Sequence, residues 1–342
     1  MAEERLHGRA MIHGMQANGL PSRTSILTAA ARALGSREPD PSVRNPDSLA
    51  ARLIGPSELA LIADHPISRA FDRDVQDAMN DPDVFGFAWL MLVRTRHIDA
   101  ALERAIGAGA TQVVILGAGF DTRAHRFADQ LQDAAIVEVD YGATQEYKRR
   151  RVHETLGTVP PNLVYAPIDF TTDSLVDVLA RAGFDRSRKT MFICEGVSMY
   201  VPEEGMQQTL RAMGSIAAPG STLLLEYINR GGLDVLTKYP SGFIKNAIEW
   251  GEPFVFGVPD GEDREYFGPL GFELGDALKI GSPESVKRYA MCADGTYYGA
   301  HLAQLFQQRR EASLKAMDDA ARAQAERAAA TSGYWLAEMT VP

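Results

Sequence analysis

Residues 113–126 read Val113-Val-Ile-Leu-Gly-Ala-Gly-Phe-Asp-Thr-Arg-Ala-His-Arg126, and this stretch decides the fold. An apolar run meets a Gly-Ala-Gly turn and a helix-compatible stretch, which predicts a strand, a tight turn and a helix. Glycine permits the turn and the close approach of a ligand, because it has no Cβ atom. The next apolar run ends in Asp140, 23 residues after Gly117. This is near the roughly 20-residue spacing at which an acid meets a ribose hydroxyl in nucleotide-binding βαβ units.

The glycine spacing indicates which nucleotide such a site would bind. A dinucleotide fingerprint has the form Gly-x-Gly-x-x-Gly, and its third glycine allows close packing beside a pyrophosphate. Counted from Gly117, that third position is Thr122. Asp121 also places a carboxylate where a pyrophosphate would dock, and like charges repel. S-adenosylmethionine suits this acid better, since it carries an ammonium, a sulfonium and a ribose but no phosphate. A βα turn of any other α/β enzyme remains the alternative interpretation of the glycines.

Bulk composition is typical of a globular α/β protein. The 342 residues are 45% apolar and 23% charged, with a net charge of −10. An acidic chain does not favour a nucleic-acid partner, whose usual footprint is a basic face. The two cysteines, Cys194 and Cys292, form no disulfide framework or zinc spacing, and the scattered histidines predict no metal site. The N-terminus lacks the apolar stretch of a signal peptide, and no apolar run is long enough to cross a membrane, so we expect a cytoplasmic protein.

Residues 111–228 alternate short apolar runs with helical segments, which predicts a parallel sheet with helices on both faces. The runs are residues 112–116, 135–139, 163–166, 191–194 and 222–227. The carboxyl ends of parallel strands meet at one edge of the sheet, where open α/β sheets bind ligands. Candidate site residues follow four of the runs, namely Gly117, Asp140, Asp169 and Glu195. We therefore expect these residues to converge on one site.

The rest of the chain is predicted to surround this core. Residues 1–110 are expected to form a helical segment that helps to cover the cofactor and the substrate. Residues 229–332 are expected to form a substrate cap, which is rich in Gly, Pro and aromatic residues and includes a long helical insertion at 301–330. Residues 333–342 are expected to add a closing strand to the core.

Five motifs together resemble the leucine carboxyl methyltransferase family, which includes phosphatase carboxyl methyltransferases and bacterial O-methyltransferases of secondary metabolism. The motifs are Ser22-Arg-Thr, Val93-Arg-Thr-Arg-His-Ile98, Gly117-Ala-Gly-Phe-Asp-Thr-Arg123, Glu138-Val-Asp140 and Cys194-Glu-Gly-Val-Ser-Met-Tyr200. The resemblance runs from about Ser22 to Tyr227, with a weaker similarity in the closing strand. It implies a Rossmann-like class I methyltransferase fold, α/β, with a seven-stranded, mostly parallel sheet whose last strand runs antiparallel.

The resemblance also implies roles for individual residues toward S-adenosylmethionine. Arg96 would grip the methionine carboxylate, and Arg94 or Arg23 could assist, since a guanidinium fork matches a carboxylate. Gly117 would let the cofactor approach the backbone, and Asp140 would accept from the ribose hydroxyls.

Three further residues complete the cofactor site that the resemblance implies. Asp169 with Phe170 would bind the adenine, the acid accepting from the exocyclic amine while the ring packs. Glu195 would lie near the cofactor's ammonium group.

The sequence leaves the methyl acceptor open. The region after Tyr227 and the 301–330 stretch depart from the family pattern, and substrate choice is expected to depend on the former. A carboxylate acceptor is ionised at neutral pH and needs no general base, whereas a phenol with a pKa of about 10 needs one. Tyr200 and His125 are the candidates to face the acceptor. We expect O-methylation of a carboxyl or hydroxyl group on a small molecule or a peptide, without predicting an oligomeric state.

Two other functions stay open from the sequence. A nicotinamide-dependent oxidoreductase could use a similar sheet, although the glycine spacing and Asp121 speak against it. A non-catalytic protein could keep the cofactor pocket and have lost methyl transfer.

Overall fold

A computed structural model describes residues 19–342, except residues 241, 316, 320–321, 324–325 and 327–332. The first 18 residues of the predicted N-terminal segment therefore lie outside the described residues. Part of the predicted 301–330 helix also lies outside them, and the helix described in this range is α16 (Ala303–Lys315).

One mixed sheet of seven strands forms the centre of the molecule, in the order β3-β2-β1-β4-β5-β7-β6. The strands are β1 (Gln112–Leu116), β2 (Ala135–Asp140), β3 (Leu163–Pro167), β4 (Thr190–Cys194), β5 (Thr222–Ile228), β6 (Glu273–Lys279) and β7 (Tyr334–Thr340). The first five are parallel, and β7 runs antiparallel between β5 and β6. This confirms the predicted fold class, including its antiparallel last strand. It also shows that β6 is part of the sheet, although its residues fall within the segment that was expected to form the cap.

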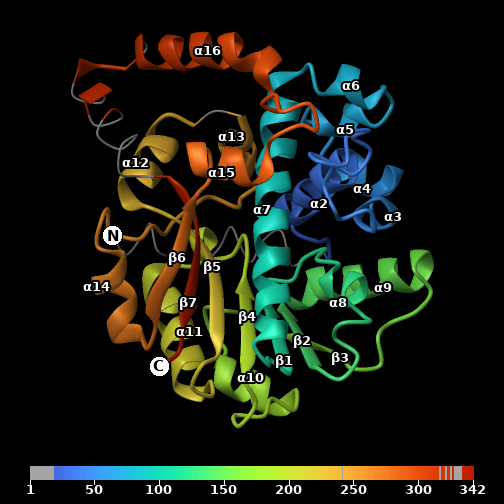
Figure 1. Ribbon diagram of the computed structural model, residues 1–342, viewed down its shortest axis with the longest axis vertical. Coiled ribbons are helices and arrows are strands. Elements are labelled where there is room, and N and C mark those ends of the chain that lie inside the picture. Colours follow the sequence, from blue (N-terminus) through green and yellow to red (C-terminus); the bar gives the residue numbers. More distant parts are fainter. Residues whose placement is uncertain (1–18, 241, 316, 320–321, 324–325, 327–332) are drawn as a thin grey trace.

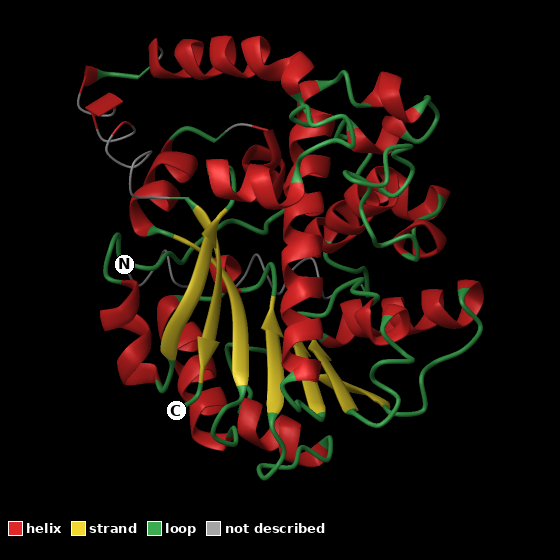
Figure 2. Ribbon diagram, viewed as in Figure 1, coloured by secondary structure: helices red, strands yellow, loops and turns green. Residues whose placement is uncertain are grey.

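Helices cover both faces of the sheet (Figures 1 and 2). Side chains alternate between the two faces along a strand, so each β1 residue packs on one layer or the other. Val113 and Ile115 pack with α7 (Pro82–Gly107), whereas Val114 and Leu116 pack with α10 (Leu175–Arg181) and α11 (Glu203–Ile216). The other helices beside this core are α8 (Arg123–Arg126), α9 (Gly142–Thr155) and α14 (Asp263–Phe267). The core is therefore a three-layer sandwich.

The described part of the N-terminal segment is helical, as predicted. Its helices are α2 (Arg23–Gly35), α3 (Ala50–Leu53), α4 (Pro56–Leu61), α5 (Ile67–Ala70), α6 (Val75–Ala78) and α7. The start of the long helix α7 is defined by its first residue and by the residue before it. Pro82 suits the first helical position, and the side chain of Asp81 accepts from the amide of Asp83 at 2.9 Å.

The segment after β5 forms a second layer above the carboxyl ends of the strands (Figure 1). It contains α12 (Arg230–Lys238), α13 (Gly242–Glu249), α15 (Pro283–Tyr289) and α16, with a short 3-10 turn at η3 (Ala300–Leu302). The 3-10 turn η2 (Gly268–Leu270) lies instead beside α11 and α14, at the opposite edge of the sheet. Another 3-10 turn, η1 (Ser198–Tyr200), follows β4. Phe243 of α13 packs on Phe87 of α7, with ring centroids 4.9 Å apart. This layer is thus fastened to the N-terminal helices by aromatic contacts.

Candidate active site

The parallel register brings the predicted strand-end residues together. The last residue of β1 is in register with Val139 of β2 and with Cys194 of β4. Gly117, Asp140 and Glu195 follow these positions, so they lie side by side where the three strands end. We call this edge, formed by the carboxyl ends of β1, β2, β4 and β5, the rim.

The glycine turn after β1 is shaped by the protein's own packing. Gly117 and Gly119 have φ angles of +60° and +46°, in the left-handed region that glycine favours. A Cβ atom on Gly117 would lie 2.0 Å from Cγ2 of Val197, and one on Gly119 would lie 3.2 Å from Cβ of Ser25. A side chain at Gly117 would therefore force Val197 aside, whatever ligand binds at the rim.

Asp140 is tied to the glycine turn. One of its oxygens accepts from the amide of Gly119, and the other accepts from the amide of Tyr141 at 2.6 Å. Burial raises the pKa of Asp140 to about 6, against the lowering effect of these two hydrogen bonds. Each carboxylate oxygen has a further lone pair, so the group can still accept from two hydroxyls.

A buried arginine of α7 reaches the rim beside Glu195. Arg94 places Nε 2.7 Å from Oε1 of Glu195 and Nη1 3.1 Å from Oε2 of Glu226 on β5. Glu226 also accepts from the amide of Gly196 at 2.7 Å. Its burial raises its pKa, which the charge of Arg94 opposes. Within the part of the chain that the structure describes, Nη2 of Arg94 is the one nitrogen of this guanidinium group without a carboxylate partner.

Arg123 of α8 holds Glu195 from the other side. Its Nη1 lies 2.7 Å from Oε2 of Glu195, its Nε lies 2.8 Å from Asp99, and it also pairs with Asp121. Burial alone would raise the pKa of Glu195, but the charges of Arg123 and Arg94 outweigh it and lower the pKa to about 2. Glu195 is therefore ionised throughout the physiological range.

These contacts extend into a chain of buried charges, which we call the rim network. Arg126 lies 2.6 Å from Asp99 and 3.5 Å from Asp47, and Asp47 lies 2.8 Å from Arg32 of α2. The members are Arg32, Arg94, Arg123, Arg126, Asp47, Asp99, Asp121, Glu195 and Glu226. Four guanidinium groups face five carboxylates, so the ionised network carries one uncompensated negative charge. A cationic ligand would offset it.

Arg96 does not join this site. Its Nη2 donates to the carbonyls of Pro41 and Arg44, at 2.8 and 3.0 Å. Two residues along a helix turn a side chain by roughly 200°, so Arg94 and Arg96 face nearly opposite directions. The structure thus brings Arg94 to Glu195 and directs Arg96 to the loop before α3.

Arg23 is engaged with the N-terminal helices. Its Nε donates to the carbonyl of Leu61 at 2.6 Å, its Nη2 pairs with Asp64 at 2.8 Å, and its guanidinium lies 4.4 Å from the ring centroid of Trp250. The guanidinium therefore fixes the start of α2 rather than adding to the rim network. The cofactor-binding roles predicted for Arg23 and Arg96 stay predictions.

Asp169 and Phe170 lie just past β3, next to the end of β2. Asp169 accepts from the amide of Thr171 at 2.9 Å and from its hydroxyl at 2.6 Å, and its own amide donates to Asp173 at 2.8 Å. Phe170 is half-buried against the core on the α10 and α11 face. The turn is ordered by local bonds, and the predicted contact of both residues with adenine stays a prediction.

Tyr200 lies at the end of η1, where the rim meets the layer above it. Its ring packs edge-on against Phe254, with centroids 5.0 Å apart. Burial and the charge of Glu252 raise the pKa of Tyr200. The hydroxyl group is thus protonated at neutral pH, and it suits a hydrogen-bond donor better than a base.

His125 faces a different part of the surface. It lines a cavity of about 430 Å³ on the flank of the core, together with Leu49, Arg52, Gln132, Leu156, Thr158 and Asn162. Burial and the charge of Lys148 lower the pKa of His125 to about 4. The structure does not bring His125 together with Tyr200, and its predicted catalytic role stays a prediction.

Glu226 and Tyr334 at the rim were not foreseen from the sequence, and neither were the network members Arg32, Asp47, Asp99 and Arg126. Glu226 is the one acid in the apolar run of β5, and a buried charge requires partners, so this signal was present. Tyr334 pairs with Ile228 in the β5–β7 register, diagonally across from Glu226. Burial and the nearby Tyr200 raise the pKa of Tyr334. Its position depends on how β7 pairs, which no local pattern reveals.

Within the described ranges, no group of three or more His, Cys, Asp or Glu side chains could hold a metal ion. Nor does any helix in that part of the chain have the length and apolar character needed to cross a membrane.

Comparison with known proteins identifies relatives of the core. The family model described as "Leucine carboxyl methyltransferase" matches residues 25–214. A Bacillus subtilis protein is 32% identical over 217 residues, covering 60% of this chain and 70% of that protein. A Mycolicibacterium vanbaalenii protein is 33% identical over 210 residues, covering 60% and 65%.

A third relative, from Mycolicibacterium smegmatis, is 28% identical over 300 residues, covering 82% of this chain and 94% of its own. All three are named as putative S-adenosyl-L-methionine-dependent methyltransferases. A solved structure of a putative methyltransferase from Thermobifida fusca superposes with a TM-score of 0.49 at 15% identity, over 79% of this chain and 89% of that one. The strand order itself defines the fold.

Proposed function

The chain belongs to the leucine carboxyl methyltransferase family and is an S-adenosylmethionine-dependent methyltransferase, and we propose that it methylates a carboxyl or hydroxyl oxygen of a small-molecule or peptide acceptor. The observation that carries the proposal is the pairing of a fixed carboxylate with a buried guanidinium along one rim. Asp140 is held by the glycine turn at one end, and Arg94 lies beside Glu195 at the other.

The rim residues fit the two ends of the cofactor. S-adenosylmethionine supplies a methyl group that is already activated by its bond to a sulfonium. Asp140 would accept from the ribose hydroxyls, and Asp169 with Phe170 would contact the adenine. Arg94, through Nη2, would bind the methionine carboxylate in the role that the family resemblance implies for Arg96. Gly117 would lie close to the cofactor backbone beside Val197.

The charge at the rim also suits this cofactor. Glu195 remains ionised because both of its oxygens meet a guanidinium group. With five carboxylates against four guanidinium groups, the rim network favours a ligand with an ammonium and a sulfonium over one with a pyrophosphate. This supports methyl transfer over the nicotinamide-dependent oxidoreductase.

Among oxygen acceptors, the geometry favours a carboxylate. Tyr200 is protonated and can donate a hydrogen bond that orients an acceptor, whereas a hydroxyl acceptor needs a group that removes its proton. His125 opens toward a separate cavity. An ionised carboxyl group attacks without a base, and alignment of the reactants can contribute roughly 7–11 kcal/mol in favourable cases. Arg94, Tyr200 and Asp140 would supply that alignment.

Isothermal titration with S-adenosylhomocysteine, the demethylated cofactor, tests the placement at the rim. We expect Arg94→Lys to weaken binding by about 2 kcal/mol, because lysine lacks the guanidinium fork. Arg96→Lys is the matched control from the same helix, and its effect should stay below about 0.5 kcal/mol. The reverse order would assign the carboxylate to Arg96 and refute the role of Arg94.

Acceptor chemistry can be screened with radiolabelled S-adenosylmethionine and a panel of carboxylic acids, phenols and peptides with free C-termini. Base-labile methyl esters are the expected products. Alkali-stable methyl ethers would instead show a hydroxyl acceptor. Turnover with any acceptor would exclude a protein that only binds the cofactor.

A further inference from the structure

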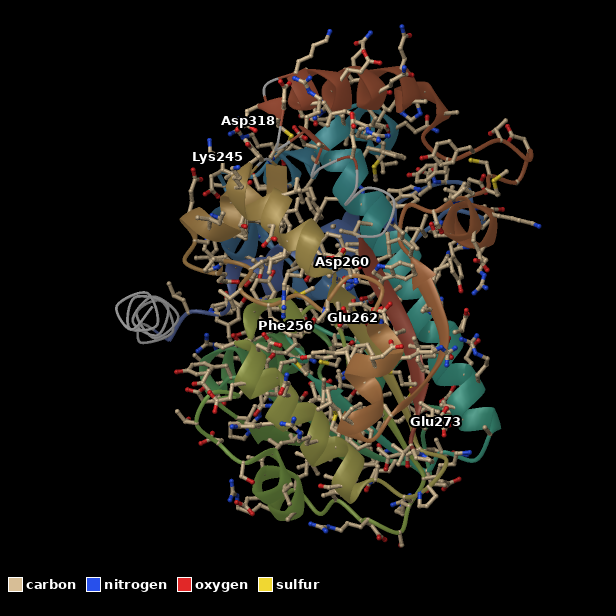
Figure 3. All side chains as sticks on the ribbon, turned by 90° about the vertical axis from the view of Figure 1, so that its left-hand side faces the viewer. Lys245, Phe256, Asp260, Glu262, Glu273 and Asp318 are labelled. Carbon is tan, nitrogen blue, oxygen red and sulfur yellow. The ribbon has the colours of Figure 1, made fainter. Side chains whose placement is uncertain are left out.

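Residues 250–258, which we call the strap, follow α13 and run across the rim. At the far end the amide of Val258 donates to the carbonyl of Ile228, the last residue of β5, at 2.8 Å. In the middle the amide of Val255 donates to the carbonyl of Met199 in η1 at 2.7 Å. The strap therefore lies over the ends of β4 and β5. Figure 3 shows Phe256 at this level, where the upper layer meets the core.

The near end of the strap meets the N-terminus of α2, which covers the other half of the rim. The amide of Ser22 donates to Oγ1 of Thr144 in α9 at 3.1 Å, just beyond Asp140. Ser25 lies against Gly119 in the glycine turn. The strap and the start of α2 together thus span the rim from β2 to β5.

One carboxylate joins the strap to α2. Glu252 accepts from the hydroxyl of Ser22 at 2.8 Å, from the amide of Arg23 at 2.9 Å, and from the amide of Thr24 at 3.3 Å. The hydroxyl of Thr24 also donates to it. A carboxylate at a helix N-terminus is stabilised by free amides and by the helix dipole. This is a strong attachment that involves a single side chain.

Of the two residues before Glu252, Trp250 is fixed in place and Gly251 can act as a hinge. Trp250 is buried, and its Nε1 donates to Asp64 at 2.7 Å. Gly251 follows with a φ of +76°, in the region that favours glycine. Glu252 is half-exposed, so water can replace its partners when it leaves. The strap can therefore release Glu252 while Trp250 stays in place.

We propose that Glu252 is a latch that holds the strap closed over the rim and so sets how fast S-adenosylmethionine enters and S-adenosylhomocysteine leaves. This rests on the proposed position of the cofactor at the rim. Because Glu252 bonds to α2, its release opens the rim equally for entry and for exit. A gate of this kind changes both rate constants and leaves the affinity nearly constant.

Stopped-flow binding of S-adenosylhomocysteine, followed by tryptophan fluorescence, tests the latch. We expect Glu252→Gln to raise the association and dissociation rate constants by about tenfold, because glutamine loses the charge but keeps one acceptor oxygen. Glu252→Ala removes all four hydrogen bonds and should raise both rate constants at least as much. The dissociation constant should change less than about threefold. Glu249→Gln is the control, since Glu249 ends α13 in solvent, 3.9 Å from Lys245.

Hydrogen–deuterium exchange provides a readout without ligand. The amides of residues 251, 252 and 254–257 should exchange faster in both Glu252 variants than in Glu249→Gln, while the thermal midpoint falls by only a few degrees. Unchanged rate constants in a wild-type-like fold would refute the latch alone. Faster dissociation with unchanged association would make Glu252 a direct ligand contact and also refute it. Failure of the wild type to bind S-adenosylhomocysteine would refute the proposed function and the latch together.

Discussion

The rim network and the ion pair of Glu138 with Lys148 both bury charge, yet their acids ionise differently. Glu138 on β2 lies 2.6 Å from the ammonium of Lys148 on α9, and both side chains are almost fully buried. Burial raises the pKa of Glu138 to about 7, against the charge of Lys148, whereas the pKa of Glu195 falls to about 2. The two acids differ in their number of partners.

Partner number explains the contrast. Both oxygens of Glu195 meet a guanidinium group, while Oε1 of Glu138 has no hydrogen-bond partner among the described side chains and backbone. One ammonium does not offset the loss of hydration of a buried carboxylate, but two guanidinium groups do. A buried acid that stays ionised at neutral pH therefore needs more than one cationic partner, as Glu195 has in the rim network.

Removing Arg123 should break the network most severely. Arg123→Met leaves three acids, Asp99, Asp121 and Glu195, without a shared partner, and we expect a loss of about 3–5 kcal/mol in the free energy of unfolding. Urea denaturation measures it. Arg149→Met, at an exposed pair with Glu146, should cost less than about 1 kcal/mol. Equal losses would mean that burial of the network contributes nothing.

Loss of the lysine from the isolated Glu138–Lys148 pair should lower the free energy of unfolding less than loss of Arg123 does. Lys148→Met should cost about 2 kcal/mol, because Glu138 can take up a proton when its partner is lost. The double variant Glu138→Met/Lys148→Met should return to within about 1 kcal/mol of the wild type, since apolar side chains replace a costly ion pair. A double variant less stable than Lys148→Met in urea denaturation would show that the pair itself stabilises the fold.

The pH dependence of cofactor binding can distinguish the titration of Asp140 from that of Glu195. Asp140 has a raised pKa of about 6, so it gains a proton as the pH falls from 7 to 5, and it then loses acceptor capacity. Affinity for S-adenosylhomocysteine in titration calorimetry should fall about tenfold over this window. Glu195, with its pKa near 2, does not titrate there. Asp140→Asn should flatten the profile, and a slope that persists in this variant would point to another group.

The smallest effect is expected at His125, whose ring lies near Lys148. His125→Gln should change the initial rate of methyl transfer by less than about twofold, because removal of a true general base costs 10²–10⁴-fold, roughly. The acceptor found in the screen proposed above serves for this measurement. A loss of roughly 10²–10⁴-fold would instead identify His125 as the general base.

The sequence predicted the sheet and half of the rim well, because both depend on local order. Apolar runs locate β1 to β5 to within a residue or so, and parallel strands must place Gly117, Asp140 and Glu195 on one edge. The spacing from glycine turn to acid follows from the length of one strand–helix–strand unit. These features require no knowledge of distant contacts.

Local sequence patterns do not predict contacts between segments that lie far apart in the chain. Arg94 and Arg96 lie two residues apart on α7, and both faces of that helix carry buried residues, so periodicity cannot tell which arginine points to the rim. Glu252 and Ser22 are 230 residues apart, and nothing local pairs them. The sequence shows that the cap is rich in aromatic residues, but which side chains they pack against depends on the tertiary arrangement.

The place of β7 has a consequence for how the chain matures. Thr222 of β5 pairs with Thr340, 118 residues later, and β6 touches the sheet only through β7. As the polypeptide emerges from the ribosome, β5 exposes an open hydrogen-bonding edge until β7 has been synthesised. Unpaired edges of this kind attract other chains. We expect nascent chains that stop short of residue 334 to depend on chaperones and to aggregate, whereas chains that contain β7 seal their own sheet.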